Sequence, residues 1–277
     1  MKIALLQYPI AWADKETNLR QTEERIAALA GLADVAVLPE MFATGFCTDH
    51  PELAETMEGD IIRRLQAAAD QSGVAIVSSF ICAPDTRAKL RNRGFMIKPH
   101  QKPITDSEAS DNRYPIEIQD KRHLYAHGGE DKFFEQASER NTFEYKGVKF
   151  QLLVCYDLRF PVWARNQSGY DYDIILVVAN WPDIRIQYWD ALIAARATEN
   201  QCYIAAVNCV GDDGMGLHYN GHSVAYDTRL QPIVSFADDE EGTKIADFDI
   251  TKLHHFREVL PLWKDVDQFK MQMMHHE

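Results

Sequence analysis

Cysteine is scarce in this sequence, and its pattern argues against two kinds of site. The chain has 277 residues and five cysteines, an odd number without any CxxC pair. Disulfide frameworks use cysteines in even numbers, and cysteine-based zinc sites use closely spaced pairs. We therefore expect neither, which favours a reducing, cytoplasmic environment. The cysteines are Cys47, Cys82, Cys155, Cys202 and Cys209.

Other ligands for a metal or a phosphate are also missing. The histidines of the C-terminal region have no standard metal-site spacing, so we expect neither a metal nor an organic cofactor. The stretch GDDGMG at 211–216 lacks the Lys-Ser/Thr pair of a phosphate loop, and we expect a turn near a pocket rim there. The histidines are His218, His222, His254, His255, His275 and His276.

Long apolar runs and an excess of basic residues are absent as well. The run Ile3–Leu6 is stopped by Gln7 and Pro9, which is too short for a signal peptide. No stretch approaches the roughly 20 apolar residues of a membrane helix. Lys and Arg number 29 against 42 Asp and Glu, for a net charge of −13. Because phosphate contacts need clustered Lys and Arg, we expect that the protein does not bind nucleic acid. Without a signal peptide or a membrane helix, we also expect a cytoplasmic protein that does not bind a membrane.

No Gly/Ser linker, repeat or low-complexity tract divides the chain. Apolar runs alternate with amphipathic helical patterns, which is typical of one α/β domain. We expect a single domain over 1–277, with a core to about residue 263 and a tail over 264–277. Strands are predicted at 2–8, 34–38, 73–81, 93–98, 148–154, 173–179, 202–208, 221–227 and 243–249, helices at 16–31, 59–71 and 186–200, and a hairpin turn at 227–230.

One segment departs from this alternation. Residues 100–113 are polar, lack periodicity and contain many turn formers, so we expect a long exposed loop. Such loops are usually only solvated, although some act as lids over a site. Whether residues 100–117 form a lid stays open.

Three reactive residues directly follow predicted buried strands or lie in charged stretches near them. Glu40 follows the second strand, Lys121 lies in QDKRHL, and Cys155 ends the run LLVC. In α/β sheets the crevice beyond the carboxyl ends of the strands is the usual ligand site. A Glu, a Lys and a Cys that converge there supply a base, an electrostatic stabiliser and a nucleophile.

Each of these residues also has a simpler explanation. A cysteine after an apolar run is usually a small core residue. A glutamate at a strand end is more often a helix cap or an ion-pair partner, and a lysine among charged neighbours usually lies on a solvated face. Singly, none of the three residues indicates catalysis.

Five motifs, which follow one another in order along the chain, favour the catalytic interpretation of these three residues. They are PEMF and TGF (39–42, 44–46), DKRHL (120–124), VCYDLRFP (154–161), ANWP (179–182) and ARATENQ (195–201). From the first strand to about Trp263 the chain resembles the nitrilase superfamily of carbon–nitrogen hydrolases. Within that superfamily it is most similar to the bacterial omega-amidase branch.

The resemblance implies a fold, an assembly and site residues. The fold is a four-layer α-β-β-α sandwich of the nitrilase type, whose subunits pair into homodimers or higher homo-oligomers. Cys155 is implied as the nucleophile, Glu40 as the general base and Lys121 as the stabiliser of the tetrahedral intermediate. A second glutamate supports the site in this family; Glu130 fits best, and Glu135 stays an alternative.

The chemistry of these groups agrees with the implied roles. A thiol with a pKa of about 8.5 is mostly protonated at neutral pH and needs help to attack. Lys121 is expected to favour the thiolate, and Glu40 to accept its proton. Lys121 and the backbone N–H of Tyr156 would bind the oxyanion of the adduct.

Omega-amidases hydrolyse the side-chain amide of small dicarboxylate monoamides such as 2-oxoglutaramate and succinamate. The free carboxylate of these substrates needs a cation or several donors. Arg159, Arg185 and the pair Asn180 and Trp181 are candidates, although Arg159 would serve equally as a partner of Asp157.

Two features depart from the omega-amidase branch. The stretch 100–117 is longer than usual, and Gln119 and Tyr125 replace the commoner tyrosine and phenylalanine around DKRHL. A nitrile or N-carbamoyl hydrolase with the same Glu-Lys-Cys machinery is therefore an alternative. A non-catalytic binding protein on this fold is a second one, against which the intact set of three residues argues.

Overall fold

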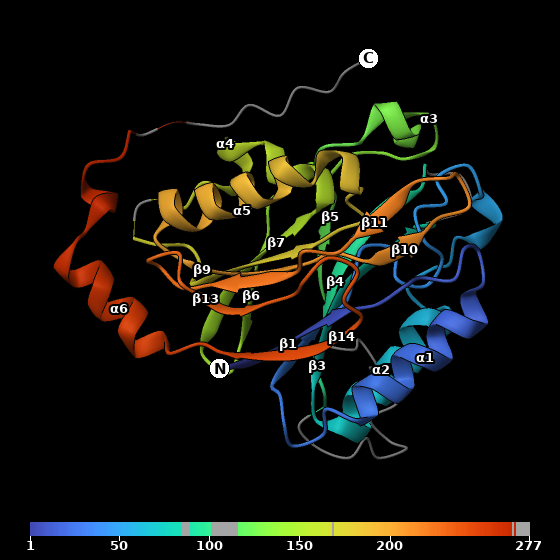
Figure 1. Ribbon diagram of the computed structural model, residues 1–277, viewed down its shortest axis with the longest axis horizontal. Coiled ribbons are helices and arrows are strands. Elements are labelled where there is room, and N and C mark those ends of the chain that lie inside the picture. The colour runs from blue at the N-terminus through green and yellow to red at the C-terminus, as the bar shows by residue number, and fades with distance from the viewer. Residues whose placement is uncertain (85–88, 101–115, 168, 268, 270–277) are drawn as a thin grey trace.

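The computed structural model describes residues 1–84, 89–100, 116–167, 169–267 and 269, which fold into four layers (Figure 1). Two six-stranded sheets stack on each other, and helices cover the outer face of each sheet. The predicted α-β-β-α sandwich is therefore confirmed. No helix among these residues is long and apolar enough to cross a membrane.

The first sheet is built mainly from the N-terminal half of the chain. Its strands β1, β2 and β3 are parallel, whereas β4, β5 and β14 join antiparallel to their neighbours. In spatial order the strands are β14 (Gly242–Asp247), β1 (Lys2–Gln7), β2 (Val35–Val37), β3 (Ala75–Cys82), β4 (Arg91–Ile97) and β5 (Ile116–Asp120).

The second sheet repeats this plan with later residues. Its central strands β7, β8 and β9 are parallel, and antiparallel strands flank them. In spatial order the strands are β13 (Pro232–Ser235), β12 (Val224–Tyr226), β9 (Tyr203–Val207), β8 (Ile174–Val178), β7 (Val148–Val154) and β6 (Thr142–Tyr145); β10 (Val210–Asp212) and β11 (His218–Asn220) form a separate hairpin.

The central strands are mostly apolar because both of their faces are covered. In β1, Ile3 and Leu5 face the core between the sheets, whereas Ala4 and Leu6 face the helices of the outer layer. The core between the sheets therefore joins residues from both halves of the chain, which fixes how the strand ends of the two sheets meet.

The outer helices have clear start and stop signals. The side chain of Asp14 accepts a hydrogen bond from the Thr17 N–H at 3.1 Å and begins α1 (Lys15–Ala27). Gly73, with a left-handed φ of 73°, ends α2 (Asp60–Ser72). These two helices lie side by side on the first sheet (Figure 1), where Arg64 of α2 donates two hydrogen bonds to Glu23 of α1.

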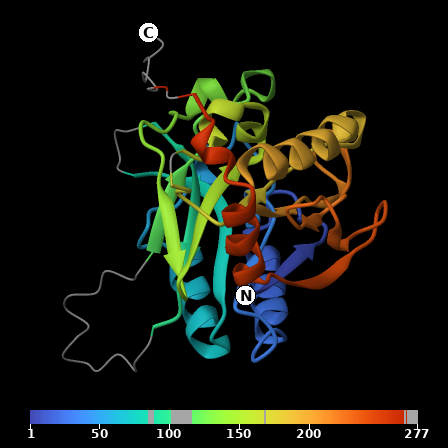
Figure 2. The same cartoon turned by 90° about the vertical axis from the view of Figure 1, so that its left-hand side faces the viewer.

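The remaining helices belong to the second half of the chain. The long helix α5 (Ile186–Asn200) packs Trp189, Ile193 and Ala197 on the second sheet. Helix α6 (Ile250–Val259) crosses the side of the molecule that faces the viewer in Figure 2. Two short helices, α3 (Glu130–Phe133) and α4 (Pro161–Ala164), lie near the ends of β5 and β7.

Most of the predicted elements are confirmed, and two of them differ for a clear reason. Strand 148–154, helix 186–200 and the hairpin turn at 227–230 are confirmed as predicted. The helix predicted over 16–31 already ends at Ala27, and the turn that follows contains Gly31 with a left-handed φ of 73°. The strand predicted over 221–227 begins only at Val224, because Gly221 and His222 have positive φ angles.

Eight helices and strands among the described residues were not predicted: β5, β6, β10, β11, β13, α3, α4 and α6. The strands among them are short and mostly polar or partly exposed, so they lack the apolar runs of the central strands. Of the stretch 100–117, the last two residues, Ile116 and Glu117, begin β5. The rest of that stretch, with the possible lid, falls on 101–115, outside the described residues, as does most of the tail over 264–277.

Candidate active site

Three loops bring Glu40, Lys121 and Cys155 together at one end of the sandwich. Glu40 follows β2, Lys121 follows β5, and Cys155 follows β7 in the facing sheet. Because β3, β4 and β5 are successively antiparallel, β5 runs in the direction of β2 and their carboxyl ends share an edge. The predicted convergence of these three residues is therefore present in the structure.

Lys121 lies between two carboxylates. Its Nζ atom is 2.9 Å from Oε1 of Glu40 and 2.8 Å from Oε2 of Glu130, and all three side chains are completely buried. Glu135, the alternative second glutamate, lies instead on the surface, where it pairs with Arg91 at 2.7 Å. Of the two glutamates that the sequence left open, Glu130 is the one beside the lysine.

Two further groups complete this cluster. Nδ2 of Asn92 in β4 donates to Oε1 of Glu40 at 2.7 Å and to Oε1 of Glu130 at 2.9 Å. The backbone N–H of Tyr125 donates to Oε2 of Glu130 at 2.7 Å. Asn92 was not predicted as a site residue. Its only sign in the sequence was a polar side chain near the start of RNRGFMI, a strand whose later residues are apolar.

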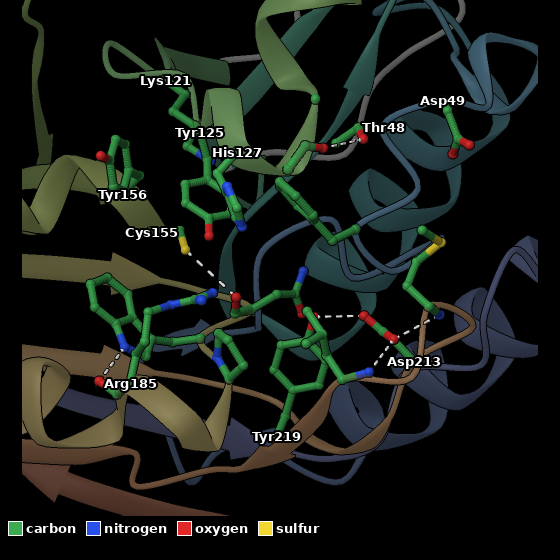
Figure 3. A pocket seen from close by; sticks show the side chains of 18 of the residues that line it. Thr48, Asp49, Lys121, Tyr125, His127, Cys155, Tyr156, Arg185, Asp213 and Tyr219 are labelled. Atoms are coloured by element: carbon green, nitrogen blue, oxygen red, sulfur yellow. Dashed lines mark hydrogen bonds between the residues drawn. The ribbon is translucent and has the colours of Figure 1, made fainter.

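Cys155 sits on a sharp turn at the end of β7. Its φ angle is +47°, a left-handed value that is uncommon for a residue with a side chain, and it begins the 3₁₀ helix η4 (Cys155–Arg159). Such strained positions occur often in active sites. Its Sγ atom lies 3.8 Å from the backbone oxygen of Asn180 and points into the pocket (Figure 3).

Asp157 holds the cysteine loop and the lysine loop together. Its buried carboxylate accepts hydrogen bonds from the N–H groups of Val154 at 3.2 Å, of His123 at 2.8 Å and of Arg122 at 3.4 Å, and contacts the His123 ring at 2.8 Å. The conformation after Cys155 is thus tied to the residues that follow Lys121. Asp157 is not the partner of Arg159 that the sequence allowed.

Burial controls the protonation states in this cluster. Burial raises the pKa of the Cys155 thiol well above its usual value, the charge of Glu40 raises it further, and Lys121 only partly opposes both. Lys121 therefore favours the thiolate, as expected, but burial and the charge of Glu40 outweigh it and leave the pKa of Cys155 raised.

The other two groups respond to the same environment in different ways. Burial alone would lower the pKa of Lys121, but the charges of Glu130 and Glu40 raise it, so the ammonium stays charged. Burial raises the pKa of Glu130, against the opposing effect of Lys121.

A pocket of about 520 Å³ opens above Cys155. Lys121, Tyr125, Tyr156 and Trp181 line it, and Asp213 with its neighbours on the β10–β11 turn reaches its rim (Figure 3). The prediction that 211–216 forms a turn near the pocket is confirmed.

Both predicted arginines belong to this pocket. The guanidinium of Arg159 lies 4.7 Å from the ring centre of Trp181 and 5.1 Å from that of Tyr188, and Arg185 lies 5.4 Å from that of Tyr125. Within the part of the chain that the structure describes, neither guanidinium is paired with a carboxylate. Aromatic faces thus orient each arginine, and its guanidinium N–H groups remain as hydrogen-bond donors for a ligand.

Asn180 also lines the pocket, but its amide is mostly engaged. Its Nδ2 atom donates to the backbone oxygen of Glu40 at 2.9 Å, and its Oδ1 atom lies 2.9 Å from the thiol of Cys209. Its backbone N–H donates to Oε2 of Glu40 at 3.0 Å. These contacts orient Glu40, so Asn180 has less freedom to bind a substrate than the sequence suggested.

The described residues contain no group of three or more His, Cys, Asp or Glu side chains that would hold a metal ion. His218 and His222 instead lie between pairs of aspartates on the surface. The five cysteines are all free, and Cys155 is the one that is not fully buried.

Comparisons with known proteins agree on one family. The model of the carbon-nitrogen hydrolase family matches residues 2–258. The omega-amidase YafV of Escherichia coli is 37% identical over 98% of both chains, and the 2-oxoglutaramate amidase of Bacillus subtilis is 31% identical over 95% of this chain and 96% of its own. A solved CN-hydrolase superfamily protein of Xanthomonas campestris, with an arsenic adduct in its active site, is 33% identical, with a TM-score of 0.90 over 98% of this chain and 99% of its own.

Proposed function

Because the chain belongs to the carbon-nitrogen hydrolase family of the nitrilase superfamily and hydrolyses amides, we propose that it is an omega-amidase. Its substrates would be small dicarboxylate monoamides such as 2-oxoglutaramate and succinamate, and its products the dicarboxylic acid and ammonia. The observation that carries this proposal is the contact of Lys121 with Glu40 and Glu130 beside Cys155, in a pocket with two arginines that have no carboxylate partner among the described residues.

The first half of the reaction forms a thioester. Glu40 takes the proton of the Cys155 thiol as the sulfur attacks the amide carbon, which matches the raised pKa of this buried thiol. The resulting oxyanion binds the Lys121 ammonium and the backbone N–H of Tyr156. When the adduct collapses, Glu40 returns the proton to the nitrogen, and ammonia leaves.

The second half regenerates the enzyme. Glu40 removes a proton from water, and the hydroxide attacks the thioester carbon. Lys121 and the Tyr156 N–H stabilise the second oxyanion as they did the first. The C–S bond then breaks, the carboxylic acid leaves, and Cys155 recovers its proton from Glu40. No step requires a metal or an organic cofactor.

The free carboxylate of the substrate would bind Arg159 and Arg185. Hydrogen bonds between guanidinium and carboxylate groups are about twice as strong as neutral ones, and aromatic packing already limits the motion of both side chains. We expect Arg159→Gln or Arg185→Gln to raise KM for 2-oxoglutaramate about 10- to 100-fold. Hydrolysis of an uncharged amide such as butyramide should change little, and Arg20→Gln on the exposed face of α1 is the matched control.

The test of the function is ammonia release from 2-oxoglutaramate and succinamate. Wild type should release ammonia, Cys155→Ser should not, and Cys82→Ser, which changes a buried cysteine at the end of β3, should behave as wild type. Absence of ammonia from every amide offered to the wild type would refute the omega-amidase proposal. Carbon dioxide released together with ammonia would favour an N-carbamoyl hydrolase, and turnover of nitriles would favour a nitrilase.

A further inference from the structure

Asn92 occupies an unusual place between the two buried carboxylates. Only 1% of its surface is exposed, and its single Nδ2 atom donates to both Glu40 and Glu130. Its backbone oxygen accepts the N–H of Lys121 at 2.9 Å. Asn92 therefore contacts the general base, the supporting glutamate and the chain of the lysine at once.

The orientation of this amide is fixed by charge. A flipped amide would turn its oxygen toward two carboxylates, so the NH₂ group must face them. In the observed orientation Oδ1 is buried without a hydrogen-bond partner among the described residues. A buried carbonyl without a partner costs free energy, so stability alone does not explain an asparagine here.

The two oxygens of Glu40 differ as a result. A carboxylate oxygen has two lone-pair positions, and Oε1 accepts from both Lys121 Nζ and Asn92 Nδ2. Oε2 accepts the N–H of Asn180 at 3.0 Å and receives neither the Lys121 nor the Asn92 hydrogen bond. Oε2 is therefore the oxygen with a position left for a proton, and Asn180 also places its backbone oxygen next to Cys155 Sγ.

We propose that Asn92 is a positioning residue that, together with Lys121, blocks Oε1 of Glu40 so that Oε2 exchanges the proton with Cys155 and with water. Its second hydrogen bond, at 2.9 Å, holds Glu130 beside Glu40 and keeps the two carboxyl groups from separating. This role rests on the proposed function of Glu40 as the general base. Leucine or alanine in place of Asn92 would leave Oε1 open to the proton.

The test is the pH dependence of catalysis in Asn92→Ala. The titratable groups that face Glu40 are Lys121, Glu130, Cys155 and Cys209. Because the carboxylate loses a donor that stabilises its charged form, we expect the acid side of the kcat/KM profile to move up by about one pH unit. We also expect kcat to fall at least about tenfold at the plateau.

Companion variants separate positioning from folding. Asn92→Ser keeps a shorter donor and should give an intermediate shift, and it replaces Asn92→Ala if that variant does not fold. Asn166→Ala removes another buried asparagine, whose Nδ2 donates to the backbone oxygens of Tyr172 and Asn200 and whose Oδ1 accepts the N–H of Asp171; it should lower stability without moving the pH profile. A profile for the folded Asn92 variants that coincides with that of the wild type would overturn the proposal.

A second readout keeps this test independent of the substrate. Alkylation of Cys155 by iodoacetamide also requires loss of the thiol proton, so its rate should show the same displaced acid limb in Asn92→Ala. If the wild type hydrolyses no amide but the alkylation profile still shifts, the omega-amidase proposal fails and the role of Asn92 stands. If alkylation is unshifted, the role of Asn92 fails whatever the substrate.

Discussion

At the scale of single residues, the site is a cluster of buried charged groups. Their contacts with one another offset the free-energy cost of burying them. Two buried carboxyl groups and one ammonium lie beside a thiol, and burial raises the pKa of Cys155 and of Glu130. The cost of this arrangement is consistent with a working site rather than a structural ion pair. Under the proposed mechanism, the sulfur would depend on a base at the moment of attack rather than on a preformed thiolate.

The two candidate glutamates give a matched pair of variants. Glu130→Gln should lower kcat/KM about 100- to 1000-fold, because its amide nitrogen would face the Lys121 ammonium and misplace it. Glu135→Gln should stay within about twofold of wild type, because its exposed ion pair contributes little. Steady-state kinetics with thermal unfolding as a folding check would measure both. Equal effects of the two substitutions would contradict the assignment of Glu130 to the site.

At the scale of elements, the ends of the strands position the residues of the site, and short turns orient their side chains. The sequence motifs predicted which residues follow β2 and β7, because an apolar run followed by a reactive residue is visible in one dimension. They did not predict Asn92, whose importance comes from the antiparallel pairing of β4 with β3 and β5. They also missed β5 itself, since a polar edge strand next to a long polar segment resembles a loop.

The turn after Cys155 offers a test at this scale. Asp157→Asn should lower the free energy of unfolding by about 1–3 kcal/mol, because several buried N–H groups lose their charged acceptor. Activity should fall as well, since the same carboxylate ties the cysteine loop to the lysine loop. Asp249→Asn at the start of α6 is the control, because asparagine caps helices as well as aspartate. An Asp157→Asn enzyme with wild-type stability and activity would refute this account of the turn.

At the scale of the whole molecule, the order of the layers could be predicted from the sequence, whereas the pairing of the strands toward the edges of the sheets could not. Alternating strands and helices and five ordered motifs indicated an α-β-β-α sandwich. The outermost strands β6 and β13 pair with their sequence neighbours β7 and β12 but are short and partly exposed, whereas the returning strand β14 pairs with β1 far away in the chain, as Lys2 does with Asp247. The arginines near the pocket were predicted individually, but their packing on aromatic rings follows only from the assembled fold.

Burial of thiols throughout the molecule predicts how stability depends on pH. Burial raises the pKa of Cys202 from 9.0 to about 12, and it raises the pKa of Cys82 to about 11. A group whose pKa is raised by folding contributes stability that is complete below its unfolded pKa and is lost as the pH rises. Between about pH 9 and pH 10, Cys202 alone should cost about 1 kcal/mol of the free energy of unfolding.

Urea unfolding under reducing conditions would measure this effect. The wild type should become less stable over that range, and Cys202→Ala should lose about 1 kcal/mol less than the wild type does. Comparing the slopes of the free energy of unfolding against pH removes the constant free-energy cost of the cavity that alanine leaves, because that cost does not depend on pH. Stability that rises with pH, or identical slopes for the two proteins, would show that the thiols are not held protonated by burial.

The most direct test of the central claim is capture of the thioester by hydroxylamine during turnover of 2-oxoglutaramate. An acyl group on Cys155 should partition between water and hydroxylamine, so the hydroxamate should appear together with ammonia in the wild type and disappear in Cys155→Ser. Ammonia release without any hydroxamate would mean that water attacks the amide directly, and it would contradict the account of Cys155 as the nucleophile.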